Sequence, residues 1–254
     1  YFMANIIKES STRIKTGVVL IIAMIIIGYI DSYFVMWLLF GTMLMISISE
    51  AKKLFQLDSD SIYVYSALLW FAAYFYPNPE DLIFIVAIGY ASQLAYKKTL
   101  DKKMFLPLFY PTASFLFLLS LYSEYGVMTL LWLLVIVASA DTGAYFVGKS
   151  IGKTKFSETS PNKTIEGVIG GVVIATILGS FFANDNLHIV SAIVVSAIVA
   201  LSSVFGDLYE SYLKREAGIK DSGDILPGHG GILDRTDGYL FGAIVMLVLL
   251  RVVG

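Results

Sequence analysis

The chain has 254 residues, of which 57% are hydrophobic and only 15% are charged, and its mean hydropathy is +0.76. Soluble domains are typically about 25% charged, so the composition excludes a soluble protein with a single anchor and predicts a polytopic membrane protein. The absence of cysteine excludes disulfides, thiolate chemistry, zinc–cysteine sites and iron–sulfur clusters, and a net charge of -2 gives no indication of a nucleic-acid partner.

Apolar runs follow one another along the whole chain, and a membrane-spanning helix needs roughly 20 such residues. The runs lie at 17–34, 35–49, 61–76, 81–96, 105–122, 127–147, 164–183, 188–206 and 238–253. They do not alternate apolar and polar residues as the strands of a membrane barrel do. The sequence therefore predicts an all-α, polytopic membrane helix bundle with about nine transmembrane helices and a kink near Asp31 between the first two.

The positions of lysine and arginine predict the orientation of these helices. Seventeen of the eighteen cationic residues fall before the first run or in the even-numbered connections, and only Arg251 falls on the other side. Because basic loops stay in the cytoplasm, we expect a cytoplasmic N-terminus in the inner (cytoplasmic) membrane. Residues 1–125 then hold about five spans with short loops. Residues 126–254 form a catalytic region with polar cytoplasmic loops at 148–163 and 207–237.

The segment 211–237 concentrates charge in an otherwise apolar chain, with five carboxylates, four cations and one histidine. Asp234 and Asp237 are three residues apart, which places both on one helix face, about 5–6 Å apart. Asp207, at the cytoplasmic end of the preceding span, can add a third oxygen ligand. Such an all-oxygen site suits Mg²⁺. A favourable interaction with the helix dipole is the alternative explanation of Asp237 alone, and Glu210 is assigned to a solvated face.

Basic residues surround these carboxylates and suit phosphate groups, since arginine binds phosphate oxygens in a bidentate manner and lysine acts as a point charge. Asp221 can bind a second cation or orient a neighbouring lysine. A loop with three glycines, residues 227–231, allows backbone N–H groups to approach a phosphate closely. The candidates are Lys214, Arg215, Lys220, Arg235, His229, Gly230 and Gly231. The alternatives are membrane anchoring for the first two and an ordinary loop position for the histidine.

A second polar cluster accompanies the sixth span. Asp141 lies inside that span, and an ionisable residue there is a functional candidate by default. Lys163, in the following loop, is a candidate phosphate contact, and Thr164 begins a helix with small residues suited to close packing. Residues 143–150 match the P-loop pattern, but they emerge from a transmembrane helix instead of following a buried strand, so a P-loop NTPase is rejected.

These residues together resemble the signature of the phosphatidate cytidylyltransferase (CDP-diacylglycerol synthase) family at every position. The resemblance is firm over about 139–254. The matching signature reads Ser211-x-Leu213-Lys214-Arg215, then Lys220-Asp221-x-Gly223, then Leu226-Pro227-x-His229-Gly230-Gly231-Ile232-x-Asp234-Arg235-Thr236-Asp237.

The resemblance implies an enzyme in the lipid bilayer that joins CTP and phosphatidic acid into CDP-diacylglycerol and releases pyrophosphate. It implies a Mg²⁺ site on Asp207, Asp234 and Asp237, an accompanying K⁺, and a homodimer. A CDP-alcohol phosphotransferase is one alternative, but residues 239–250 lack the further aspartates which that family requires. A cation-coupled transporter using Asp141 and Asp207 is another, although the charges gather at one membrane edge and no internal repeat is present.

Overall fold

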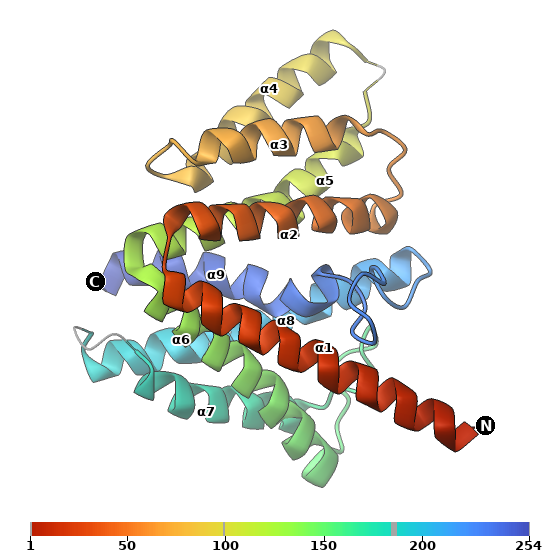
Figure 1. The fold of residues 1–254 in the computed structure, drawn as a ribbon, viewed down its shortest axis with the longest axis vertical. Coiled ribbons are helices and arrows are strands. Elements are labelled where there is room, and N and C mark those ends of the chain that lie inside the picture. Colours follow the sequence, from red (N-terminus) through yellow and green to blue (C-terminus); the bar gives the residue numbers. More distant parts are fainter. Residues whose placement is uncertain (1, 99, 184–186, 254) are drawn as a thin grey trace. The chain divides into compact units, whose positions relative to one another are not determined.

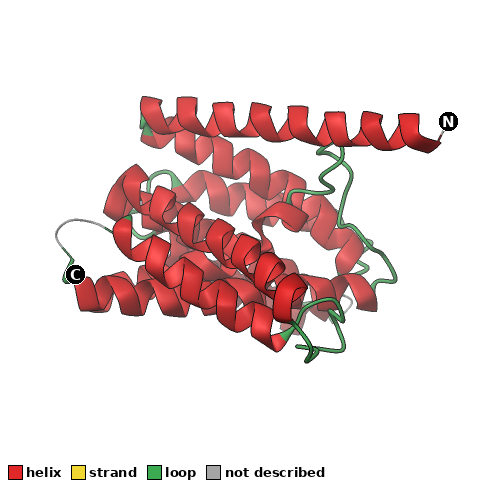
Figure 2. Ribbon diagram, turned by 90° about the horizontal axis from the view of Figure 1, so that it is seen from below, coloured by secondary structure: helices red, strands yellow, loops and turns green. Residues whose placement is uncertain are grey.

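The structure, a computed structural model, describes residues 2–98, 100–183 and 187–253, and their side chains from residue 15 onward. Regular structure in this part of the chain is helical (Figure 2). Only two isolated bridges of strand type occur there, Lys155 with Thr164 and Leu226 with Gly230. The predicted all-α class is confirmed.

The chain forms two compact units. Unit 1 consists of Tyr1–Phe115 and Ala217–Arg235, and unit 2 of Leu116–Glu216 and Thr236–Gly254. The loop before the last helix therefore belongs with the N-terminal helices, although it lies in the predicted catalytic region. The assignment of catalysis to residues 126–254 concerns function and stays a prediction.

Unit 1 is built on a run of apolar helices in which α1 and α2 are separated at Asp31, whose φ of 41° ends the first helix where the kink is predicted. Its elements are α1 (Phe2–Ile30), α2 (Tyr33–Leu54), α3 (Ser61–Ala73), η1 (Pro79–Asp81), α4 (Leu82–Tyr96), η2 (Lys102–Met104), α5 (Phe105–Pro107) and the π-helical η3 (Leu108–Ala113). Trp37 and Trp70 tie α2 to α3, because each indole N–H donates to the other residue's carbonyl oxygen, at 2.9 and 3.1 Å.

Unit 2 contains most of α6 (Ser114–Ile151), together with α7 (Ile165–Phe181) and α8 (Ile189–Glu216), which lie side by side (Figure 1), and all but the first turn of α9 (Leu233–Val253). Gly126, with φ 76°, interrupts α6 between the two spans predicted there. The P-loop-like residues lie inside α6, where a Cβ at Gly143 would meet the Gly171 Cα of α7 at 3.0 Å. Small residues therefore set this contact, as predicted for α7.

Four helical segments in the described residues are long and apolar enough to cross a membrane. They are Tyr33–Leu54, Lys102–Ile151, Ile189–Glu216 and Leu233–Val253. Shorter apolar helices occur at Lys15–Ile30, Ser61–Ala73 and Ile165–Phe181. The chain is therefore a helical membrane protein, while the count of nine spans and the cytoplasmic N-terminus stay predictions. The polar loops are shorter than predicted, because α6 continues to Ile151 and α8 to Glu216.

Candidate active site

Unit 2 brings two of the predicted metal ligands together where α8 crosses α9. A Cβ at Gly206 would lie only 2.5 Å from the Asp237 carbonyl oxygen, so the two backbones touch at this point. Asp207 follows Gly206 directly, and its charge acts on the Asp237 carboxyl group, as does the charge of Asp141 from α6. The Asp237 Oδ1 also accepts the Gly238 N–H at 2.8 Å. Three carboxylates of the predicted site thus share one region of unit 2.

Two lysines partly balance this negative charge. Lys163 forms an ion pair with Asp207, and both side chains are mostly buried, with 23% and 30% of their surface exposed. Lys214 lies 3.2 Å from the carboxylate of Glu210 and also attracts the Asp237 carboxyl group. The structure therefore places Lys163, Lys214 and Asp141 beside the acidic pair, while their roles in substrate binding and catalysis stay predictions.

The assignment of Glu210 to a solvated face is wrong, since its side chain is fully buried. Helical spacing explains the burial: Ser203, Gly206, Glu210 and Leu213 form one buried face of α8. The helix continues past the end of the predicted span, so this face stays covered. Glu210 therefore acts as the buried partner of Lys214.

The loop between α6 and α7 is anchored on Glu166, in the first turn of α7. Its carboxylate accepts the N–H groups of Lys153 and Thr154, at 3.1 and 3.2 Å, and the Thr154 hydroxyl at 2.9 Å. Thr164 caps the same helix by accepting the Gly167 N–H at 3.1 Å, which confirms the predicted helix start. The anchored loop carries Lys163, and its geometry therefore fixes the position of that ammonium group.

Replacing Glu166 with glutamine is expected to lower turnover several-fold, because an amide cannot accept all of these hydrogen bonds and the loop carrying Lys163 is loosened. The steady-state rate measures the effect, together with the KM for the CTP that the family resemblance implies. Glu158→Gln is the matched control, since Glu158 is exposed in the same loop, and it should behave as wild type. Equal kinetics for the two variants would contradict the anchoring role.

Unit 1 contains the other half of the signature, folded as a tight loop before α9. The Asp234 Oδ2 atom accepts three hydrogen bonds, from the Ser222 N–H at 2.8 Å, the Ser222 hydroxyl at 2.9 Å and the Gly231 N–H at 2.8 Å. Gly228 and Gly230 have φ values of 77° and 84°, which only glycine adopts at little cost. Asp234 therefore holds the loop in shape, besides its predicted role in metal binding.

Glu50 of α2 is a central partner of this loop, and the sequence did not predict its role. Its side chain is 2% exposed, and its carboxylate accepts the N–H groups of Ile232 and Leu233, at 2.9 and 2.8 Å. It also lies 3.1 Å from the Ser222 hydroxyl. The available signal was an ionisable residue directly after an apolar run, which is weaker than the position inside a run that identified Asp141.

The remaining predicted residues lie on the surface or in the loop. Arg235 is exposed, and its Nε donates to the His229 carbonyl oxygen at 2.7 Å. The His229 Nδ1 atom is buried and has no hydrogen-bond partner among the described residues. Exposed positions at the end of α8 and in the loop are those of Arg215, Lys220 and Asp221.

The three predicted metal ligands are divided between the units, with Asp234 in unit 1 and Asp207 and Asp237 in unit 2. Within the residues that the structure describes, no group of three or more histidine, aspartate or glutamate side chains is arranged to hold a metal ion. The magnesium site on these three aspartates therefore stays a prediction.

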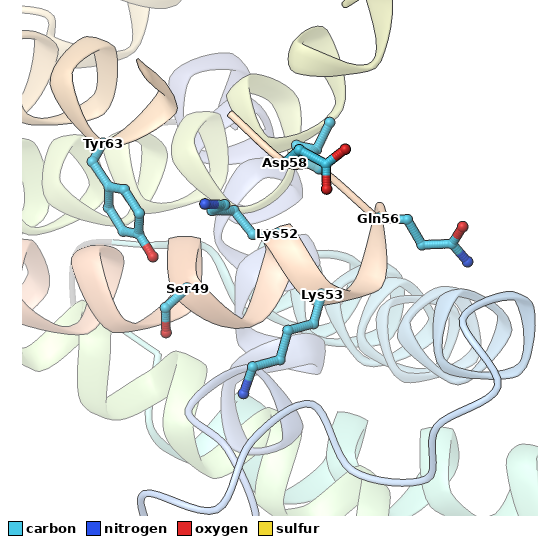
Figure 3. A pocket seen from close by; sticks show the side chains of 7 residues that line it. Ser49, Lys52, Lys53, Gln56, Asp58 and Tyr63 are labelled. Atoms are coloured by element: carbon cyan, nitrogen blue, oxygen red, sulfur yellow. The ribbon is translucent and has the colours of Figure 1, made fainter. Parts of the chain in front are cut away.

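A hollow of about 470 Å³ on unit 1 is distinct from the predicted site residues. Figure 3 shows its lining side chains around the C-terminal end of α2, where Lys52 and Lys53 leave the helix in different directions. Lys52 pairs with Asp60 and lies 5.4 Å from the centre of the Tyr63 ring. The lining is Ser49, Lys52, Lys53, Gln56, Leu57, Asp58 and Tyr63. The lining therefore contains both positive and negative side chains, and its charge does not select for an anionic ligand.

Comparison with known proteins identifies the class of protein that this fold and these residues define. The profile of the Cytidylyltransferase family matches residues 11–253. The chain therefore belongs to the cytidylyltransferase family, a family of enzymes that here takes the form of a helical membrane protein.

Individual relatives narrow the similarity further. A phosphatidate cytidylyltransferase of Helicobacter pylori strain J99 is 46% identical over 249 residues, which cover 97% of this chain and 93% of that protein. The protein of the same name from strain 26695 is 47% identical with the same coverage. The phosphatidate cytidylyltransferase of Bacillus subtilis strain 168 is 48% identical over 122 residues, 46% of this chain and 45% of that protein.

Proposed function

We infer that this protein catalyses the transfer of CMP from CTP to phosphatidic acid, giving CDP-diacylglycerol and pyrophosphate. The observation that carries this function is the near full-length similarity to proteins named phosphatidate cytidylyltransferase, at 46% and 47% identity. The membrane-spanning helices agree with a substrate that resides in the bilayer. The product, a CDP-activated lipid, assigns the enzyme to phospholipid biosynthesis.

The reaction joins two anions, so charge neutralisation and positioning supply most of the catalysis. A phosphate oxygen of phosphatidic acid attacks the α-phosphorus of CTP, a new P–O bond forms, and the bond to the β-phosphate breaks as pyrophosphate leaves. Lys163 and Lys214, next to Asp207 and Glu210, can bind phosphate oxygens of the reactants. Further phosphate contacts are proposed for Arg215, Lys220, Arg235, His229 and the backbone of Gly230 and Gly231.

The charges of unit 2 favour a bound divalent cation. Four carboxylates, those of Asp141, Asp207, Glu210 and Asp237, gather in this unit, and the ammonium groups of Lys163 and Lys214 interact with three of them. Oxygen donors of this kind suit Mg²⁺, and we propose that Asp207 and Asp237 hold it together with Asp234. A bound Mg²⁺ supplies charge neutralisation at the nucleotide phosphates. Asp221 can serve an accompanying K⁺ or orient Lys220.

The proposed setting is the inner membrane, with about nine spans, a cytoplasmic N-terminus and an active site open to the cytoplasm. The alternation of basic connections supports this orientation. CTP is then available from the aqueous side, and phosphatidic acid enters from the bilayer. A homodimer, implied by the family resemblance, completes the proposal.

The purified protein is expected to release pyrophosphate only when both CTP and phosphatidic acid are present. Removing Mg²⁺ with a chelator should lower the rate by at least about 100-fold, because the charge neutralisation at the phosphates is lost. Pyrophosphate release and formation of CDP-diacylglycerol, measured in the same samples, test both statements, and re-addition of Mg²⁺ is the control.

The same assay separates the two alternatives. CMP release from CDP-diacylglycerol with an alcohol acceptor, but no reaction of CTP, would indicate a CDP-alcohol phosphotransferase. Solute flux into proteoliposomes without turnover of CTP would indicate a transporter. Either result refutes the proposed function.

A further inference from the structure

Glu50 brings a negative charge from α2 into the interior of unit 1. Desolvating a carboxylate is costly, so a buried one needs several donors. Glu50 has two backbone donors, Ile232 and Leu233, and lies within hydrogen-bond distance of the Ser222 hydroxyl. These partners are between 172 and 183 residues away in the sequence. Among the described residues, the hydrogen-bond partners of Glu50 all lie outside α2, so its carboxylate fixes the conformation of a distant loop.

The backbone donors belong to the start of α9, which begins at Leu233. The first N–H groups of a helix have no partners within the helix, and a negative charge is favoured next to them. Glu50 thus acts as a cap supplied by another helix. This cap determines where α9 begins, and the helix carries Asp234 in its first turn.

Two glycines of the signature lie directly against the Glu50 side chain and leave no room for a side chain of their own. A Cβ at Gly223 would lie 2.5 Å from the Glu50 Oε1 atom, and a Cβ at Gly231 would lie 2.6 Å from its carboxyl carbon. Contacts below 3.0 Å are not found for real Cβ atoms. At these two positions the absence of a side chain makes room for the carboxylate.

Ser222 connects Glu50 to Asp234. The serine is 1% exposed, and its hydroxyl oxygen lies 3.1 Å from Glu50 Oε2 and 2.9 Å from Asp234 Oδ2. A hydroxyl group carries a single hydrogen, so the two carboxylates compete for one donor and their positions are coupled. A displacement of Glu50 is therefore transmitted to Asp234 through the serine and through the start of α9.

We propose that Glu50 is a positioning residue for cytidylyl transfer, which acts on Asp234 through Ser222 and the first turn of α9. This inference rests on the proposed function, because it assigns Asp234 to the Mg²⁺ site. Outer partners that orient a metal ligand typically change metal affinity by roughly 10- to 100-fold when they are removed. A residue that only stabilised the fold would leave the metal requirement of the folded enzyme unchanged.

The test compares Glu50→Gln with wild type in two measurements. An amide at this position presents an NH₂ group to donors that need an acceptor. We therefore expect the Mg²⁺ concentration for half-maximal turnover to rise by at least roughly tenfold. Trypsin cleavage after the exposed Lys220 should also accelerate by about tenfold, because the loop opens locally. The protease measurement needs neither substrate nor metal.

Glu80→Gln is the matched control, because Glu80 is 4% exposed and lies in the short element η1. It should keep the wild-type Mg²⁺ requirement and protease resistance. Ser222→Ala removes the hydroxyl that lies between Glu50 and Asp234 and keeps the Ser222 N–H bond to Asp234. It should raise the Mg²⁺ requirement as well, so it carries the test if Glu50→Gln does not fold. A folded Glu50→Gln protein, or failing that Ser222→Ala, with the wild-type Mg²⁺ requirement and loop protection would overturn the proposal. Absence of pyrophosphate release by the wild-type protein would instead refute the function, and the protease result would still report on Glu50.

Discussion

Replacing Asp237 with asparagine is expected to lower cytidylyl transfer by roughly 100- to 1,000-fold while the protein remains folded. The substitution keeps the size of the side chain and an oxygen that can accept the Gly238 N–H, but removes the charge proposed to hold Mg²⁺. The rate of pyrophosphate release at saturating CTP and phosphatidic acid measures the effect.

The stability of the same variant separates a functional role from a structural one. The Asp237 carboxylate lies in the field of Asp207 and Asp141, and like charges repel one another most strongly where water is excluded. Without metal, the melting temperature of Asp237→Asn should therefore equal or exceed that of wild type. Asp81→Asn, at an exposed position of η1, is the control for an ordinary loss of charge. Normal turnover by a folded Asp237→Asn protein would refute its metal role.

Local patterns in the sequence predicted the helices and part of the site well. Apolar runs placed the elements, Asp31 marked the break between α1 and α2, and Thr164 marked the start of α7. Asp141, Asp207 and Lys163 were singled out in two separate clusters by a simple rule, that charge beside a membrane is costly and is kept for a purpose, and the structure brings them together. These features depend on residues that are close together in the chain, or on a charged residue standing in an apolar segment, and both can be read from the sequence.

The contacts that shape the signature loop depend on tertiary structure and were not predictable in the same way. Glu50 is followed closely by Lys52 and Lys53, so the pattern there indicates an ordinary basic membrane edge. Glu210 is part of a charged helix end, and only the packing of α8 shows that its face is buried. In both cases the missing information is the identity of the partner surface.

The signature glycines illustrate the same difference. The sequence assigned Gly230 and Gly231 to the close approach of backbone N–H groups to a phosphate. In the structure the Gly231 N–H donates to the Asp234 Oδ2, and the space where its Cβ would stand is filled by the Ser222 hydroxyl and the Glu50 carboxylate. The glycine does permit a close approach, as predicted, but the group that approaches it is a carboxylate of the protein itself. Phosphate binding by this loop stays a proposal.

Gly231→Ala is expected to reduce turnover by roughly 100-fold, close to the effect of moving a reacting group by about 1 Å. The new methyl group would clash with the Ser222 Oγ and would stand 2.6 Å from the Glu50 carboxyl carbon. Glu50 is buried and held by backbone donors on both carboxylate oxygens, so it cannot turn away without breaking them. Overpacking of this kind typically costs about 1–3 kcal/mol of stability. Turnover and the free energy of unfolding, measured on the same preparations, test the two parts.

A glycine without close neighbours provides the matched control for this substitution. Gly89 lies in α4 of the same unit, and a Cβ there would meet no atom within 4 Å. Gly89→Ala should therefore keep full turnover and gain about 0.5–1 kcal/mol, since alanine favours a helix over glycine. If Gly231→Ala retained wild-type turnover and stability, the loop would have another way to accommodate Glu50. The close contact would then not determine the position of Asp234, and the coupling from α2 to the start of α9 would lose its structural basis.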